Sequence, residues 1–365
     1  MALKVAIVGL PNVGKSTLFN ALTQTAAAQA ANYPFCTIEP NVGDVAVPEP
    51  RLEALARIAG SKEIIPARIN FVDVAGLVRG ASKGEGLGNQ FLATIRDCDA
   101  VAFVARCFVD DDVTHVEGRV DPLDDLDIIE TELMLADLES LEKRVVNLEK
   151  RAKGGDKDSA TTLRLVKLAL EQLNAGRPAF TAKVPADDEK AWRMLQLLTA
   201  KPALYVCNVD EASAETGNEL SAKVVERAAK DGAKAVVISA KIESEIAMLD
   251  ACERAEFLET LGLHEPGLNR MIREAYALLG LQTYFTVGPK EARAWTIDVG
   301  DTAPAAAGVI HTDFEKGFIR AETIAYDDYV RLNGEAGARE AGKLRSEGKE
   351  YVVRDGDVMN FRFNV

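Results

Sequence analysis

The stretch Gly9-Leu10-Pro11-Asn12-Val13-Gly14-Lys15-Ser16 decides the fold of this chain. It follows the apolar run 5–8 and leads into residues 17–22, whose composition is that of a helix. A strand, a glycine-containing turn and a helix in this order gather backbone N–H groups around a phosphate; the lysine reaches its β/γ-oxygens and the serine hydroxyl reaches Mg²⁺. The alternative is a glycine-rich turn without a ligand.

We predict an α/β fold with a mostly parallel sheet flanked by helices. The expected nucleotide contacts here are Asn12, Val13, Gly14, Lys15, Ser16 and Thr17.

The composition limits what else the chain can be. With 365 residues, 27 glycines and 47% hydrophobic residues, it is typical of a globular protein of two or three domains. No stretch approaches the roughly 20 apolar residues of a membrane span and no signal peptide is evident, so we expect no membrane contact and a cytoplasmic location. Its five cysteines are scattered without Cys-x-x-Cys spacing, which argues against disulfides or a zinc site. A net charge of −14 restricts any RNA contact to a local patch.

Downstream of the phosphate turn, the chain has a set of three residues that is typical of a magnesium and γ-phosphate site. Thr37 can offer a second hydroxyl to Mg²⁺, and Asp73, at the end of the apolar run 68–72, can hold a water of the ion. Gly76 then presents a backbone N–H to the γ-phosphate. Each signal is weak alone, since threonines before strands and Asp-x-x-Gly are common. Their order after the turn favours a metal site at Ser16, Thr37 and Asp73, with Gly76 as the γ-phosphate sensor.

The residue after Gly76 bears on mechanism. Ras-like enzymes use a glutamine there to orient the attacking water. Leu77 can neither donate nor accept a hydrogen bond, so the water must be positioned otherwise. The glycine-rich run 80–88 indicates a switch segment, and an ordinary surface loop is the alternative.

Base selection is expected at Asn208-Val209-Asp210-Glu211, after the apolar run 203–207. Guanine-specific relatives carry Asn-Lys-x-Asp; here Val209 replaces the lysine and Glu211 the aspartate, which damages a guanine reader. The Asn208 amide can pair with adenine N6 and N7, as asparagine does in DNA. Ser239, after the run 235–238, would supply the last base-side loop. The sequence favours ATP, with a relaxed GTP site as the alternative.

These residues resemble one family closely: the Obg-like ATPases, the YchF group within the translation-factor-related GTPase class. The resemblance spans essentially the whole chain. It is carried by the turn at 9–16, the altered base motif and the segments Asn32-Tyr33-Pro34-Phe35-Cys36-Thr37-Ile38-Glu39-Pro40-Asn41 and Asp73-Val74-Ala75-Gly76-Leu77-Val78-Arg79-Gly80-Ala81. It implies ATP hydrolysis, Mg²⁺ dependence, a mechanism without glutamine, and association with the large subunit or the whole ribosome. It also implies K⁺ as a possible activator at Asn12.

His115 is the candidate for the missing glutamine. It lies in a loop after the apolar run 101–104, at the edge of the sheet where ligands gather, and the only other histidines, His264 and His311, fall outside this part of the chain. The family resemblance also points to His115. The alternative is a histidine that packs the loop. We predict His115, Lys15 and Gly76 as the catalytic residues.

Heptad-like spacing between the sensor and the base motif predicts two helices folded back on each other. A break at residues 153–158 separates two apolar series: Met134, Leu138, Leu141, Val145, Leu148 and Ala152, then Leu163, Val166, Leu170 and Leu173. Residues 143–167 hold eight basic and three acidic residues. This local reversal of charge favours a projection that touches rRNA phosphates, and a solvated helix pair is the alternative.

Beyond Gly280 the pattern is that of short strands, at 284–289, 293–297 and 351–363. Residues 308–321 resemble the TGS domain, a ubiquitin-like fold whose expected task is to bind rRNA, tRNA or a protein partner. We therefore predict a nucleotide-binding domain at 1–124 and 200–278, an inserted helical coiled-coil hairpin at 125–199, and a TGS domain at 279–365. Three functions remain: a ribosome-associated ATPase switch, a GTP-dependent assembly or translation factor, and a binding protein with incidental hydrolysis. A monomer is favoured.

Overall fold

The computed structural model describes residues 3–30, 41–74, 76, 80, 87–110, 112–116 and 118–364. Contacts divide the chain into two compact units, Met1–Asp44 with Asn70–Met271, and Val45–Ile69 with Ile272–Val365. The predicted nucleotide-binding domain included residues 45–69, whereas the contacts group this segment with the C-terminal unit. The other predicted domain boundaries stay predictions.

The first unit is built on a six-stranded, mostly parallel sheet of order β2-β4-β1-β5-β6-β7. Parallel pairing joins β1 to β4 and to β5, β5 to β6, and β6 to β7. Every residue of β5 is buried, as expected for a central strand covered on both faces. The predicted fold class is confirmed. The strands are β1 (Lys4–Val8), β2 (Val42–Ala46), β4 (Arg68–Asp73), β5 (Ala100–Arg106), β6 (Ala203–Asn208) and β7 (Lys234–Ile238).

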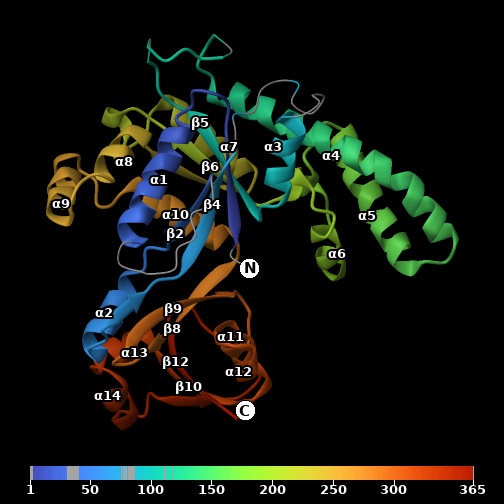
Figure 1. The fold of residues 1–365 in the computed structure, drawn as a ribbon. Helices are drawn as coiled ribbons and strands as arrows, with labels where there is room; N and C mark the ends of the chain where they lie inside the picture. The colour runs from blue at the N-terminus through green and yellow to red at the C-terminus, as the bar shows by residue number, and fades with distance from the viewer. Residues whose placement is uncertain are drawn as a thin grey trace. The chain divides into compact units, whose positions relative to one another are not determined.

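Helices cover this sheet, and their ends follow ordinary capping chemistry. Asn218 and Ser221 form a capping box at the start of α7, and Asp250 and Glu253 form one at the start of α9. The helices α1 and α8 lie side by side, and α7 packs on β6 and β7 (Figure 1). The bounds are α1 (Lys15–Ala30), α3 (Leu87–Arg96), α7 (Glu219–Lys230), α8 (Ala240–Ile246), α9 (Ala251–Thr260) and α10 (Gly267–Leu278).

The predicted helical hairpin is present: α4 (Pro122–Lys153) leads away from the sheet and α5 (Lys157–Asn174) returns beside it (Figure 1). Both predicted apolar series contribute to its seam: Leu141 of α4 and Val166 and Leu173 of α5 are buried, and the other predicted residues are half-buried. Leu165 and Ala169 of α5 are also buried, although the predicted spacing did not include them. Asp137 on α4 is fully buried and accepts hydrogen bonds from the Leu198 N–H and from the N–H and hydroxyl of Thr199. This carboxylate ties the hairpin to the chain that returns through α6 (Glu189–Arg193) to β6.

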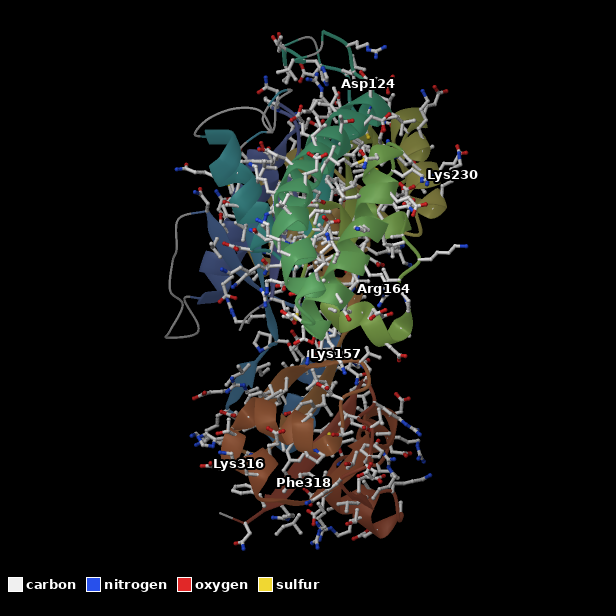
Figure 2. The ribbon with its side chains drawn as sticks, turned by 90° about the vertical axis from the view of Figure 1, so that its right-hand side faces the viewer. Asp124, Lys157, Arg164, Lys230, Lys316 and Phe318 are labelled. Atoms are coloured by element: carbon white, nitrogen blue, oxygen red, sulfur yellow. The ribbon has the colours of Figure 1, made fainter. Side chains whose placement is uncertain are left out.

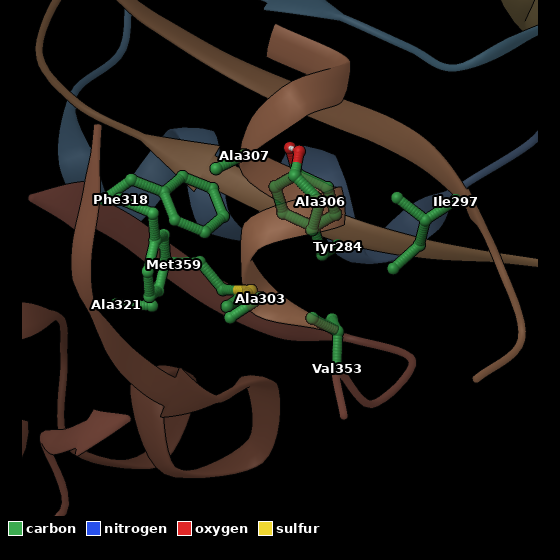
Figure 3. Packing of buried hydrophobic residues seen from close by; sticks show 10 residues of the cluster. Tyr284, Ile297, Ala303, Ala306, Ala307, Phe318, Ala321, Val353 and Met359 are labelled. Carbon is green, nitrogen blue, oxygen red and sulfur yellow. Dashed lines mark hydrogen bonds between the residues drawn. The ribbon is translucent and has the colours of Figure 1, made fainter. Parts of the chain in front are cut away.

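The second unit contains a six-stranded mixed sheet of order β11-β10-β12-β8-β9-β3. The alanine-rich face of α11 packs against it, and the Tyr284 hydroxyl donates a hydrogen bond to the Ala306 carbonyl at 2.9 Å (Figure 3). The last strand begins at Asp357, later than the predicted start at 351. The strands are β3 (Glu63–Ile65), β8 (Leu281–Val287), β9 (Glu291–Asp298), β10 (Phe318–Ala325), β11 (Arg345–Glu347) and β12 (Asp357–Phe363). The helices are α2 (Pro50–Ala59), α11 (Ala303–Ile310), α12 (Thr312–Lys316), α13 (Tyr326–Arg331) and α14 (Glu335–Glu340).

Residues 45–69 belong to this unit because they complete its sheet. Strand β3 pairs in parallel with β9, and the Arg51 guanidinium bonds both Glu49, at the start of α2, and Asp355, before β12. In the part of the chain that the structure describes, no helix is long and apolar enough to cross a membrane.

Candidate nucleotide-binding site

The carboxyl ends of the parallel strands bring the predicted motifs of the first unit to one edge of the sheet. The phosphate turn follows β1, Asp73 ends β4, the loop with His115 follows β5, and Asn208 ends β6. Ser239 follows β7 directly. Ligands of open α/β sheets bind at this edge, so the fold assembles one candidate site from distant parts of the sequence.

The turn between β1 and α1 requires glycine. Gly14 has φ +91°, and a Cβ atom there would lie 2.1 Å from the Asn208 Nδ2. A Cβ on Gly9 would lie 2.9 Å from the Val104 carbonyl oxygen. The turn therefore approaches neighbouring atoms closely, while Ser16 and Thr17 stay exposed at the first turn of α1. Exposed N–H groups and hydroxyls at a helix start suit an anion.

Lys15 and Asp73 form the charged centre of the site. Lys15 is buried, and burial lowers the pKa of its ammonium although the attraction of Asp73 opposes the shift. Burial likewise raises the pKa of the Asp73 carboxyl against the opposing effect of Lys15. Each group therefore loses more from desolvation than it gains from the other, which leaves both available to a charged ligand.

One carboxylate oxygen of Asp73 fits a magnesium site. Its Oδ1 is buried and has no hydrogen-bond partner among the described residues. A hard cation with oxygen ligands would satisfy it, and the Ser16 hydroxyl is a second ligand of the right kind. No group of three or more His, Cys, Asp and Glu gathers around a metal position in the described ranges. Mg²⁺ here would take its remaining ligands from phosphate and water, as it usually does. Thr37 lies outside the described residues.

Gly76 lies against the phosphate turn. A Cβ at this position would be 3.2 Å from the Pro11 Cγ and 3.3 Å from the Pro11 nitrogen. The chain that leaves β4 therefore passes close to the turn at Gly76, and the role of Gly76 as γ-phosphate sensor stays a prediction. Leu77 and residues 81–86 lie outside the described part of the chain.

Asn208 has a structural contact that the sequence did not reveal. Its Nδ2 donates to the Val13 carbonyl at 2.9 Å, and its Oδ1 accepts from the Ala240 N–H at 2.9 Å. The buried amide therefore joins the phosphate turn to the loop at the start of α8. One amide hydrogen and one lone pair remain for a purine. The only sequence signal was an asparagine at the end of a buried strand.

The other base-motif residues are arranged differently from one another. The Val209 side chain is buried, and its N–H donates to the Ile238 carbonyl at 2.9 Å. Glu211 is exposed and forms an ion pair with Lys241, and this hydrogen bond lowers the pKa of the Glu211 carboxyl. Ser239 is buried, and its hydroxyl has no hydrogen-bond partner within the described residues. Of the four predicted residues, Glu211 alone presents an exposed side chain, and that side chain is paired.

His115 is buried and contacts the start of the hairpin. Its Nε2 lies 2.9 Å from the Asp125 Oδ2. Burial raises the pKa of the Asp125 carboxyl, and the hydrogen bond to His115 opposes that shift. The packing contact is thus present, and the catalytic role of His115 stays a prediction.

Arg106 shapes the loop that carries His115, a role that the sequence did not suggest. This buried guanidinium donates to the carbonyl oxygens of Phe108, Asp110 and Val113 at 2.9–3.2 Å. An arginine closing an apolar strand was the available signal. The loop is also held from outside: the Asn12 Nδ2 donates to the Thr114 carbonyl at 3.1 Å. The phosphate turn and the His115 loop are therefore in direct contact.

The turn between β1 and α1, with its buried lysine and the carboxylate of the neighbouring strand, places the chain in the class of P-loop nucleoside triphosphatases. Two family models match it. Residues 4–150 match the family described as "50S ribosome-binding GTPase", and residues 281–364 match YchF-GTPase_C, described as "Protein of unknown function (DUF933)".

Relatives and a solved structure match over the full length. The chain is 59% identical to a protein of Haemophilus influenzae and 54% identical to one of Bacillus subtilis, both named "Ribosome-binding ATPase YchF", with 100% of each chain covered. The "Structure of the Schizosaccharomyces pombe YchF GTPase" superposes with a TM-score of 0.87 at 37% identity, covering 99% of this chain and 97% of that one. The chain belongs to the YchF family, as the sequence motifs predicted.

Proposed function

We propose that this protein hydrolyses ATP to ADP and phosphate with Mg²⁺ and acts as a nucleotide-dependent switch that associates with the ribosome. The observation that carries the proposal is the buried Lys15 beside an Asp73 oxygen that has no hydrogen-bond partner among the described residues, at a phosphate turn that requires glycine. The bacterial relatives are named ribosome-binding ATPases. Mg²⁺ bound at Ser16, Asp73 and Thr37 would neutralise phosphate charge.

The chain's own residues have separate tasks in this proposal. Lys15 binds the β- and γ-oxygens, and the Gly76 N–H contacts the γ-phosphate. His115 orients the attacking water, because Leu77 stands at the position where Ras-like enzymes have the water-orienting glutamine. The purine is bound by Asn208, Val209, Glu211 and Ser239. Asn208 also stabilises the phosphate turn through its hydrogen bonds to Val13 and Ala240.

The ion pair between Glu211 and Lys241 supports ATP over GTP. A carboxylate at this position reads the N1–H and N2–H₂ donors of guanine, and Lys241 here neutralises and occupies it. GTP is the second candidate, because one matching family and the superposed structure carry GTPase in their descriptions. Calorimetry with each nucleotide and Mg²⁺ decides between them. We expect tighter binding of ATP; GTP affinity at least tenfold the tighter would overturn the assignment.

Substitutions of Lys15 and Asp73, the charged centre of the site, test whether the protein hydrolyses ATP. Phosphate release from ATP should require Mg²⁺ and should be lost in Lys15→Ala and Asp73→Asn, because each removes a group that meets the triphosphate or its cation. Surface Lys223→Ala, on α7, is the control and should retain the rate. Unchanged turnover in both site variants would contradict the proposed site.

His115→Ala tests the water-positioning role separately. We expect kcat to fall at least tenfold with the ATP dissociation constant within about twofold, because general acid–base groups act on the reaction rather than on binding. An unchanged kcat would remove His115 from the mechanism and leave the nucleotide site intact.

The remaining parts of the proposal concern K⁺, the ribosome and the oligomeric state. Asn12 lies on the turn with φ +62°, and K⁺ coordinated there would raise turnover in KCl relative to NaCl. Co-sedimentation of ribosomes with the intact protein and with a variant lacking 125–199 tests binding through the hairpin to rRNA or tRNA. The C-terminal unit, proposed as a TGS domain, is a second candidate contact. Size-exclusion chromatography with light scattering tests the proposed monomer.

A further inference from the structure

The contact between His115 and Asp125 joins the loop after β5 to the start of the hairpin through two buried side chains. His115 comes from the loop after β5, and Asp125 comes from the first turns of α4. The two side chains are 4% and 3% exposed, with 2.9 Å between Nε2 and Oδ2. Burying a carboxylate and an imidazole is costly unless each satisfies the other, so this geometry is strongly constrained.

Other contacts hold the main chain of the loop, and the bond to Asp125 acts on the imidazole ring itself. Arg106 binds three of its carbonyl groups, Asn12 binds that of Thr114, and the Asn218 Nδ2 donates to the Cys107 carbonyl at 2.7 Å. These bonds fix where His115 leaves the backbone. The side-chain bond to Asp125 then sets how the imidazole points.

The same bond selects one form of the imidazole. An ionised carboxylate can only accept a hydrogen bond, so an ionised Asp125 favours the form of the ring that carries a proton on Nε2. A histidine that orients a nucleophile needs one defined tautomer, and a buried carboxylate on its far nitrogen is the usual means of supplying it.

A second buried carboxylate of α4 contacts the other switch element. The Glu132 Oε1 accepts a hydrogen bond from the Gly80 N–H at 2.7 Å. Asp125 and Glu132 are seven residues apart and so share one face of the helix. This face of α4 therefore contacts both the loop after β5 and Gly80.

We propose that Asp125 is the positioning residue of His115 in nucleotide hydrolysis, and that the start of the hairpin thereby forms part of the reaction centre. The inference rests on the proposed role of His115. Asp125 does not touch the nucleotide in this assignment; it acts through the ring that it orients.

The test measures kcat and KM for ATP in Asp125→Ala, Asp125→Asn, His115→Ala and the double variant Asp125→Ala/His115→Ala. We expect kcat to fall at least tenfold in Asp125→Ala with KM within about twofold, because orientation and not binding is lost. Asp125→Asn keeps an accepting oxygen and should recover part of the rate. In the His115→Ala background, Asp125→Ala should change kcat by less than about twofold, since residues that act as a unit are not additive.

Asp124→Asn is the matched control. Asp124 is the preceding residue on α4, but its partner is the exposed Arg119, and it lies at the end of the hairpin opposite Lys157 (Figure 2). Its kcat should be unchanged. An unchanged kcat in Asp125→Ala, or equal losses with and without His115, would overturn the inference and indicate a purely structural role. If His115→Ala itself kept full kcat, both the histidine role and this inference would fail, while ATP binding and hydrolysis would stand. The isosteric Asn variant keeps the test decisive where the Ala variant is poorly folded.

Discussion

At the scale of single residues, Gly14 and Asn208 show how close contacts define the site. The absent side chain of Gly14 makes room for the Asn208 amide, which ties the turn to the start of α8. The phosphate turn and the base side are therefore one interlocked structure. A change at either position should act on both.

Gly14→Ala should destabilise the protein and weaken nucleotide binding together. The positive φ costs an alanine about 1–2 kcal/mol, and the new Cβ would also displace the Asn208 amide. Thermal unfolding and calorimetry with ATP measure the two effects. Gly60→Ala is the control, because Gly60 has φ +64° but no described atom lies within 4 Å of the added Cβ. Equal ATP affinity in the two variants would contradict the proposed coupling between the phosphate turn and Asn208.

Lys241→Ala should shift base preference toward GTP. Without its ion pair, the Glu211 carboxylate becomes available to the guanine donors, so the ratio of GTP to ATP affinity should rise about threefold or more. Competition titrations with both nucleotides measure the ratio. A ratio equal to that of the wild type would show that Glu211 does not face the purine.

At the scale of elements, α4 carries more than the hairpin seam. One end contacts His115 and Gly80, its middle is tied by Asp137 to the returning chain, and its far end packs against α5. The packing of its far end against α5 lies away from the contact with His115, so hairpin stability can be tested by a substitution in α5.

Leu165→Ala should loosen the hairpin without abolishing nucleotide binding. Leu165 is fully buried in the seam, and such truncations cost about 2–5 kcal/mol. Hydrogen exchange should accelerate in α4 and α5, with the ATP dissociation constant within about twofold. Val146→Ala, at an exposed position of α4, should change neither. Loss of nucleotide binding in Leu165→Ala would show that the two parts fold as one.

The contact between α8 and α10 should make stability depend on pH. The Glu243 Oε1 accepts from the Gly267 N–H at the start of α10, and burial raises the pKa of Glu243 to about 7. The folded protein then holds a proton that the unfolded chain has lost, so stability falls as pH rises from about 4.5 to about 7. Glu243→Gln keeps the accepting oxygen but cannot ionise. Denaturant unfolding should show its advantage over the wild type growing by up to about 3 kcal/mol between pH 5 and pH 8. A constant difference across this range would contradict the assignment.

At the scale of the whole molecule, charge is unevenly spread over a protein of net charge −14. Four of the eight basic residues counted in the sequence form ion pairs with carboxylates: Lys143, Arg151, Arg164 and Lys167. Within the described residues, Lys150, Lys153 and Lys157 are exposed and have no ion pair. Lys157 lies at the end of the hairpin far from Asp124 (Figure 2). The basic character is therefore concentrated at the hairpin tip.

The triple variant Lys150→Glu/Lys153→Glu/Lys157→Glu should weaken proposed ribosome binding and flatten its salt dependence. Each lost phosphate contact reduces the salt slope by about one unit. Co-sedimentation at several salt concentrations measures this, and ATP turnover without ribosomes should be unchanged. Lys223→Glu on α7 is the control for a change of charge elsewhere. Equal binding by the wild type and the triple variant would exclude the tip as a phosphate contact.

The sequence by itself determined the parallel nucleotide-binding sheet, the phosphate turn, the paired helices and the family. Strand periodicity, glycine spacing and the heptad seam are local patterns, because the backbone geometry that produces them repeats every few residues. The sequence did not predict that residues 45–69 belong to the C-terminal unit. Strand β3 pairs with β9, which is more than 200 residues away, and such pairing produces no local sequence pattern.

Only the tertiary structure decided what the polar side chains contact. Asn208 braces the phosphate turn, Glu211 pairs with Lys241, Arg106 shapes a loop, and His115 meets a carboxylate on the hairpin. A side chain's partner depends on which buried donor or acceptor lies within about 3 Å of it after folding. For Asn208 and Glu211, whose partners lie 30 or more residues away, that proximity is set by strand order and helix packing, which sequence spacing does not encode. For Arg106 and His115 the partners are near in sequence, but the path of the loop after β5 decides which of them are reached.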